Sequence, residues 1–472
     1  MNKFWKPLTT CLALMLSLMM FASCGKTGKT TSSDNGSQDT GSSAVSNETS
    51  STSDAVSSAQ TSSQNSSSRS VSSRNPNAPA VPTSKYGLQV TSEGVVTLNG
   101  KTFYGMGVNQ HGAFRYGELS KALGQSGTGI GINIDGYFKP LLDNGIPFVR
   151  CQLGVFYANE VKYYVDQHDL YMQAMDKFFA KAEEYNIGII ASLMWNLGTF
   201  CEYYGEPVSE VGNPNSKGVK LAVKYVTEIA ERYKDCPALW AYEIGNEGNL
   251  GVDLRWMGSQ HMDLTTAQLN SYYKTISAAI KAKDPNRLLV AGDSEPRGSS
   301  KSLRTRQSWS PSDTYADTKE TFQLYTPSPL NTISLHMYNE TAGTVRDFNT
   351  PIAKYVKIAK ELKIGLFVGE FGPGANVFAD NYNDQIGESD PREKLERDNF
   401  YAVVNAIVNN GVQISAAWCY RRDEQKDATS IIPGVRNDYQ WKKIIDVNEG
   451  YRSRGVAEIN DYWSGVTNKF YK

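Results

Sequence analysis

The sequence has almost no net charge and lacks the short motifs that mark many nucleotide- and metal-binding proteins. Its 472 residues include 48 Lys and Arg against 49 Asp and Glu, for a formal net charge of -1. Such a balance leaves no basic footprint for nucleic acid, whereas a neutral substrate is compatible with it. No G-x-G-x-x-G follows an apolar run, no G-x-x-x-x-G-K-[ST] occurs, and none of the 4 His residues pair at i, i+4. The sequence therefore indicates neither a nucleic-acid-binding protein nor a zinc protease.

Cysteine is scarce, with 6 residues in the chain. Cys11 and Cys24 fall in the N-terminal segment, and the rest of the chain holds Cys151, Cys201, Cys236 and Cys419. Four cysteines allow more than one pairing, which sequence alone does not decide. Because no C-x-x-C occurs and no two His residues stand at i, i+4, we predict no metal and no obligatory disulfide framework. We also expect that the protein needs no cofactor.

One long apolar run, from Leu8 to Phe21, follows a basic start and ends in Ala22-Ser23-Cys24. This layout is typical of an export signal, and the run is short for a spanning helix, which needs ~20 apolar residues. The small-small-Cys ending resembles a bacterial lipoprotein signal. That resemblance implies that residues 1–24 are a signal peptide and that Cys24 carries a lipid that anchors the protein to the cell membrane. Phe21 stands where that family usually has Leu, so plain secretion is the alternative.

Residues 25–85 contain no Leu, Ile, Met, Phe, Tyr, Trp or Cys. A segment of Ser, Thr, Asn, Gly and Gln cannot bury enough apolar surface to offset its ordering entropy. We predict a disordered Ser-rich linker, with a glycosylated stalk as the alternative. Residues 86–472 are then the folded catalytic domain.

Short apolar runs recur through this domain, and several are followed by a stretch of helical period. The runs are Thr102–Gly107, Ile146–Arg150, Ile187–Trp195, Ala238–Gly245, Arg287–Ala291, Thr332–His336, Ile364–Glu370 and Gly411–Trp418. Two helical stripes are Ala222, Tyr225, Val226, Ile229, Ala230 and Tyr233, and Leu269, Tyr272, Tyr273, Ile276 and Ile280. Alternation of strand and helix predicts an α/β fold, a (β/α)8 TIM barrel. A doubly wound open sheet is the alternative, because alternation does not reveal closure.

Two of these runs lead into a glutamate. The run ending Tyr242-Glu243-Ile244-Gly245 is followed by Asn246-Glu247, and a second run ends at Glu370. Strands covered on both faces read as near-continuous apolar runs, so a carboxylate at their end needs a reason. The start of a solvated loop would explain either glutamate alone. In a barrel the C-terminal strand ends form the active site, so we expect the two carboxylates to meet there.

These residues resemble the cellulase-like glycoside hydrolases of clan A, family 5 in particular, over about residues 86–425. In that family the fourth barrel strand ends in aromatic-Glu-x-x-Asn-Glu, and the seventh ends in a glutamate before small residues. The resemblance implies that Glu247 is the acid/base and Glu370 the nucleophile of a retaining reaction. It also implies that Asn246 binds the sugar 2-hydroxyl.

Further residues match the family's substrate-binding positions. Arg150 matches the strand-two arginine beside the nucleophile, His336 and Tyr338 match the strand-six His-x-Tyr, and Trp418 matches the strand-eight sugar platform. Trp195-Asn196 stands where relatives often place a histidine, and we take Asn196 as the candidate there. Gly248 replaces the usual proline after the Asn-Glu pair, which predicts a looser loop.

We therefore predict an exported enzyme that hydrolyses a plant-type β-linked polysaccharide, as cellulases and mannanases do. We expect a monomer whose partners are the polysaccharide and, through the lipid, the membrane. A sugar-binding surface lipoprotein without catalysis is the alternative, either a two-lobed transport component or a silent barrel. The loops 108–137 and 292–330 carry no periodicity that predicts a shape.

Overall fold

A computed structural model of the protein describes residues 85–125, 133–154, 157–254, 263–374, 391–421, 429–457, 459–466 and 470. The predicted signal peptide with Cys24 lies outside these residues, as does the predicted linker apart from Lys85. Within the described part of the chain, no helix combines the length and the apolar character that crossing a bilayer requires.

Eight parallel strands form a closed barrel, which confirms the predicted fold class. In barrel order they are β4 (Gly105–Asn109), β5 (Phe148–Gln152), β6 (Gly188–Ser192), β7 (Leu239–Glu243), β8 (Leu288–Val290), β9 (Thr332–Met337), β10 (Gly365–Phe371) and β11 (Ile414–Ala417). Each overlaps one of the apolar runs. Every residue in them is buried, as expected for strands covered on both faces.

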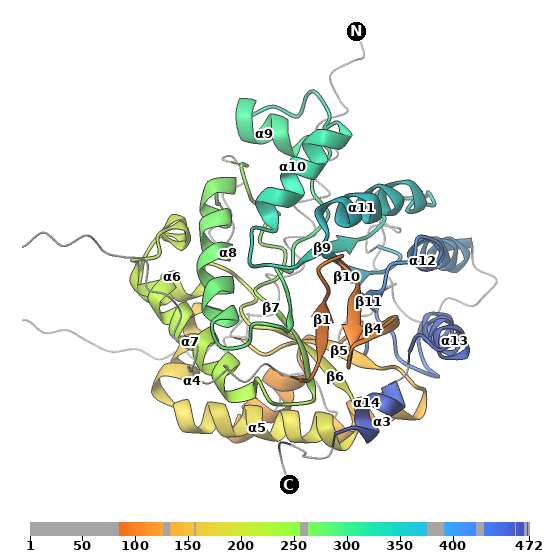
Figure 1. Ribbon diagram of the computed structural model, residues 1–472, viewed down its shortest axis with the longest axis horizontal. Coiled ribbons are helices and arrows are strands. Elements are labelled where there is room, and N and C mark those ends of the chain that lie inside the picture. The colour runs from red at the N-terminus through yellow and green to blue at the C-terminus, as the bar shows by residue number, and fades with distance from the viewer. Residues whose placement is uncertain are drawn as a thin grey trace, which may run out of the picture. The chain divides into compact units, whose positions relative to one another are not determined.

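A helix follows each barrel strand and lies outside it (Figure 1). These helices are α3 (Ile134–Asp143), α5 (His168–Glu184), α7 (Lys217–Tyr233), α8 (Thr266–Lys281), α10 (Tyr315–Tyr325), α11 (Asn349–Leu362), α12 (Pro391–Asn409) and α13 (Asp438–Ser453). The two apolar stripes read from the sequence are buried on α7 and α8. Their burial against the barrel supplies the hydrophobic stabilisation that holds each helix in place.

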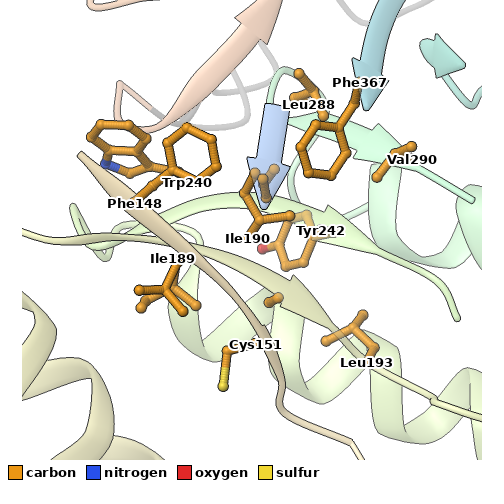
Figure 2. Close-up of a cluster of buried hydrophobic side chains, with 14 of the residues drawn as sticks. Phe148, Cys151, Ile189, Ile190, Leu193, Trp240, Tyr242, Leu288, Val290 and Phe367 are labelled. Atoms are coloured by element: carbon orange, nitrogen blue, oxygen red, sulfur yellow. The ribbon is translucent and has the colours of Figure 1, made fainter. Parts of the chain in front are cut away.

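A small antiparallel sheet covers the N-terminal end of the barrel, and the apolar runs did not predict it. Its strands are β1 (Leu88–Val90), β2 (Val96–Leu98) and β3 (Lys101–Thr102). At this end the Trp240 indole lies beside the Phe148 ring, with centroids 6.0 Å apart (Figure 2). A Cβ on Gly188 would come within 2.1 Å of that indole, so only glycine fits there. Because the N-terminal end of the barrel is closed, we look for the functional site at the C-terminal end.

The remaining helical elements lie in the connections, except the last, which follows α13. They are a π-helix at Ala113–Leu119, 3-10 turns at Ala158–Glu160 and Val208–Gly212, and α2 (Ser120–Ala122), α4 (Val161–Asp166), α6 (Thr199–Tyr203), α9 (Ser300–Arg306) and α14 (Ile459–Ser464). The loop 292–330 thus contains α9 and the whole of α10, and the loop 108–137 contains the π-helix and α2. Residues 126–132 of the latter lie outside the described range.

Candidate active site

Arg150 is the centre of a polar network at the C-terminal end of the barrel. Its Nε donates to both carboxylate oxygens of Glu243 at 2.9 Å. Its Nη1 donates to Glu370 Oε1 at 2.6 Å and to Asn109 Oδ1 at 2.9 Å, and its Nη2 donates to Asn246 Oδ1 at 2.7 Å. Because these partners come from strands around the whole ring, the guanidinium lies inside the barrel. One buried cation thus joins two buried carboxylates.

Arg150 and Tyr338 favour the ionised form of Glu370. Its side chain is 6% exposed, and Tyr338 Oη donates to its Oε2 at 2.7 Å. Burial raises the pKa of Glu370, and His336, Arg150 and the Tyr338 hydroxyl oppose that shift. The His336 contribution requires a protonated ring, but burial lowers the pKa of His336 to about 4. At neutral pH, Arg150 and Tyr338 are therefore the groups that stabilise the carboxylate.

Glu247 lies four residues beyond the end of β7, whereas the sequence placed it close to the strand end. The chain from Ile244 still follows β8, because Ile244 N donates to Val290 O at 2.9 Å and Glu247 N to Gly292 O at 2.7 Å. Glu247 has a left-handed backbone with φ of 51°, a conformation that clusters at functional sites. Burial raises the pKa of Glu247 to about 7, although the Arg150 charge lowers it. This carboxyl is suited to carry a proton near neutral pH.

The two glutamates face each other across His336. One carboxylate oxygen from each and a His336 ring nitrogen all lie within 4.8 Å of one another, and His336 Nδ1 is 3.1 Å from Glu247 Oε1. Three such groups could also hold a cation. The Arg150 guanidinium, 2.6 Å from Glu370 Oε1, already supplies positive charge and disfavours a second cation there. The arrangement better fits a protonated carboxyl opposite an ionised one.

An aromatic wall stands beside the carboxylates. Trp195, Trp418 and Cys419 form one buried cluster with Tyr338 packed against it. The His111 ring stacks on Trp418, with centroids 5.5 Å apart and planes at 30°. The Trp418–Cys419 peptide bond is cis. The face of an indole is a surface on which the C–H groups of a sugar ring can pack.

The structure brings most of the predicted site residues into one contact network. Arg150, Asn246, His336 and Tyr338 contact one another or the two glutamates, and Trp418 packs with Tyr338. Asn196 follows β6 next to Trp195 and is 8% exposed. Its backbone carbonyl accepts a hydrogen bond from Thr199 N at 3.2 Å. Its role in sugar binding stays a prediction, as do the catalytic roles of the two glutamates.

Sequence reasoning missed three site residues: Glu243, Asn109 and His111. Glu243 stands in the quoted run before Glu247, and a buried carboxylate in an apolar strand calls for a buried cation. Asn109 and His111 lie in a polar stretch directly after the first apolar run. The sequence thus showed a carboxylate in an apolar run and a polar stretch after another run. Neither feature indicated which residue it contacts.

The looser loop expected at Gly248 stays a prediction, but the residue itself is closely packed. A Cβ at this position would lie 2.4 Å from Leu197 Cδ1 and 2.9 Å from the Tyr273 hydroxyl oxygen. A larger side chain would require the ends of the Leu197 and Tyr273 side chains to move, so these two residues leave little room beside the turn that carries Glu247.

Comparison with known families gives one match over most of the barrel. The family model described as cellulase (glycosyl hydrolase family 5) matches residues 116–424. The matched segment contains Arg150, Glu247 and Glu370.

Curated relatives match a shorter part of the chain. The probable mannan endo-1,4-beta-mannosidase F of Aspergillus flavus is 27% identical over 128 residues, 26% of this chain and 25% of that protein. The mannan endo-1,4-beta-mannosidase F of Aspergillus clavatus is also 27% identical over 128 residues, 26% of this chain and 27% of that protein. The chain thus spans about a quarter of the length of these curated relatives.

Among solved structures, an endo-1,4-beta-mannanase from Rhizomucor miehei superposes with a TM-score of 0.56 at 16% identity, covering 78% of this chain and 99% of the other. A family 5 mannosidase from the same organism has a TM-score of 0.53 at 15% identity, with 81% and 99% covered. At these identities the likeness shows the fold alone.

Proposed function

Because this chain belongs to glycosyl hydrolase family 5, we propose that it hydrolyses a β-linked polysaccharide by a retaining double displacement. The pairing of Glu247 and Glu370 carries this proposal. Their nearest carboxylate oxygens lie within 4.8 Å. Retaining glycosidases place the two carboxyl groups about 5–5.5 Å apart, whereas inverting ones need about 6.5–9.5 Å for a water molecule.

In the first step, Glu370 attacks the anomeric carbon while the protonated Glu247 gives its proton to the departing glycosidic oxygen. The C–O bond to the leaving sugar breaks as the ester to Glu370 forms. In the second step, Glu247, now ionised, takes a proton from water, and the oxygen of that water displaces Glu370. Arg150 and Tyr338 keep Glu370 ionised before the attack and after its release, since both donate to its oxygens.

Neighbouring groups position the sugar. Asn246, fixed by Arg150 Nη2 at 2.7 Å, presents its side-chain N–H to the sugar 2-hydroxyl. Trp418 and Trp195 form the platform beneath the ring at the cleavage point.

We propose a β-1,4-mannan as the substrate, because the curated relatives are named as mannan endo-1,4-beta-mannosidases. Cellulose and mixed glucans are the alternatives. The test is a panel of purified mannan, cellulose, mixed glucan and xylan, with new reducing ends counted and products sized. Release of a ladder of oligosaccharides from mannan supports endo-acting mannanase activity. Binding to any of these polymers without new reducing ends would instead support the non-catalytic sugar-binding alternative.

We further propose that the enzyme is exported and held at the cell membrane by a lipid on Cys24. This proposal rests on the signal-like residues 1–24 and on the composition of residues 25–85, which would serve as a tether.

A further inference from the structure

Asp293 lies opposite the turn that carries Glu247, and hydrogen bonds on both sides of it hold that turn. Gly292 O accepts from Glu247 N at 2.7 Å. On the other side, Ser294 N donates to Asn249 Oδ1 at 2.9 Å, and Asn249 Nδ2 donates back to Ser294 O at 2.8 Å. Gly292 and Ser294, on either side of Asp293, are thus hydrogen-bonded to Glu247 and Asn249, on either side of Gly248. Asp293 itself is 4% exposed.

The Asp293 side chain is linked to the same turn through Tyr273 of α8. Tyr273 Oη donates to Asp293 Oδ1 at 2.6 Å. This hydroxyl oxygen is the atom that a Cβ on Gly248 would approach to 2.9 Å. Asp293 Oδ2 is buried, and no residue within the described ranges hydrogen-bonds to it. The Tyr273–Asp293 pair therefore fills the space behind the acid/base turn.

The backbone before Asp293 packs on the Arg150 network. A Cβ on Gly292 would lie 2.9 Å from Glu243 Cδ and 1.9 Å from Gly245 O. Only glycine permits this approach, which brings Asp293 close to two other acidic groups. The titratable groups that face Asp293 are Tyr273 from α8, Tyr325 from α10, Glu243 at the end of β7 and Glu247 in the turn. Those that face Glu247 are Arg150, His336, Glu370, Tyr338 and Glu340.

Asp293 and Glu247 titrate in the same range. Burial raises the pKa of Asp293 to about 7 against the Tyr273 hydrogen bond, and the Glu243 and Glu247 charges add to the rise. Burial also raises the pKa of Glu247 to about 7. An interaction between two charges is the same free energy seen from either group, so ionised Asp293 raises the pKa of Glu247 in turn.

We propose that Asp293 is a positioning residue whose ionisation is coupled to that of Glu247, so that Glu247 keeps its proton to a higher pH than it would alone. This inference rests on the proposed acid/base role of Glu247. The same pair, Tyr273 and Asp293, also packs behind the turn, where the Tyr273 hydroxyl oxygen lies close to Gly248.

The test is the pH dependence of kcat/KM on the polysaccharide that the panel identifies. Asp293→Asn keeps the shape and can still accept from Tyr273, but it cannot ionise. In this variant, the fall of kcat/KM at alkaline pH (the alkaline limb of the profile) should shift to lower pH by on the order of one unit. Tyr273→Phe removes the donor that helps Asp293 ionise, so it should shift the limb in the same direction by less. Asp253→Asn is the matched control, because this buried carboxylate caps α8 through Thr266. It should lower thermal stability and leave the limb unchanged.

Superimposable alkaline limbs for wild type, Asp293→Asn and Tyr273→Phe would overturn the coupling. If Glu247→Ala is at the same time inactive on polysaccharide, the proposed function stands and only the coupling fails. If Glu247→Ala is fully active, both fail. Should Asp293→Asn not fold, Tyr273→Phe alone decides, since it removes only the hydroxyl group and keeps the ring in place.

Discussion

The carboxylate of Glu243 receives the Nε–H of Arg150 on both of its oxygens at 2.9 Å, and the two side chains are 0% and 1% exposed. The planar guanidinium has no freedom to rotate once this edge is bound. Its Nη1 and Nη2 groups are thereby directed at Glu370 and Asn246. Glu243 contacts no sugar in the proposed reaction. It orients the Arg150 guanidinium, whose charge stabilises the Glu370 carboxylate.

Glu243→Gln should therefore lower both activity and stability. It removes one charge of a buried pair, and breaking such a pair costs about 3–5 kcal/mol. We expect kcat to fall by about 10²-fold because the misdirected Arg150 no longer orients Glu370 and Asn246. Steady-state kinetics and denaturant unfolding measure the two effects. The matched control is Asp143→Asn, in an exposed pair with Lys139, which should cost less than about 1 kcal/mol. Equal losses in the two variants would contradict this role of Glu243.

Glu370→Ala should be nearly inactive on every substrate, because no glycosyl-enzyme can form without the nucleophile. The cavity left by the side chain lies beside Arg150, whose charge would attract a small anion. Azide should then restore part of the turnover on an activated aryl glycoside and give a product of inverted configuration, which NMR identifies. A rescued product of retained configuration would show that Glu370 is not the nucleophile.

Much of the barrel could be predicted because each of its strands coincides with a short apolar run, which is a local pattern in the sequence. The run Ile364–Glu370 is apolar up to its final glutamate, and the stripe on α7 repeats at helical spacing. The fold class follows from such local signals, and the glutamate after each of two runs points to the strand ends that form the site.

The Arg150 network could not be predicted, because its partners are distant in sequence. Glu243, Asn246 and Glu370 are 93, 96 and 220 residues away from Arg150. No local period encodes which buried cation meets which buried carboxylate. The packing of Gly248 shows the same limit. Its neighbours Leu197 and Tyr273 are distant in sequence, so the sequence alone does not predict these contacts.

Cys24→Ser should release the protein into the medium or leave its signal uncleaved, if the lipid on Cys24 supplies the membrane affinity. Cell fractionation with immunoblotting measures this. Activity on soluble substrate should be unchanged, because Cys24 precedes the folded domain. Unchanged membrane association of the serine variant would rule out the lipid anchor.

Glu247→Gln should change how stability depends on pH. The pKa of Glu247 is raised from 4.5 to about 7, so the folded protein binds this proton more tightly than the unfolded chain does. The resulting stabilisation is complete below about pH 4.5 and is lost as the pH rises through about 7. Glutamine has no such proton to lose, so the stability of the variant relative to wild type should rise between about pH 5 and pH 8, by at most about 3 kcal/mol. Parallel Tm curves over this range would contradict the raised pKa.

Glu247→Ala should separate the two steps of the proposed reaction. General acid assistance is worth about 10²–10⁴-fold, so cleavage of natural polysaccharide should fall by that factor. An aryl glycoside whose leaving group departs unaided should form the glycosyl-enzyme at nearly the wild-type rate. Hydrolysis of that intermediate still lacks its general base, so a burst of aryl alcohol should precede slow turnover. Azide needs no base, so it should accelerate the slow phase and yield a glycosyl azide of retained configuration.

The contrast with Glu370→Ala is the decisive comparison, because the same anion should give opposite configurations in the two variants. If Glu247→Ala instead loses activity equally on both substrates and azide has no effect, Glu247 is not the acid/base. If it folds normally and keeps wild-type activity on polysaccharide, the Glu247–Glu370 pair is not the catalytic pair.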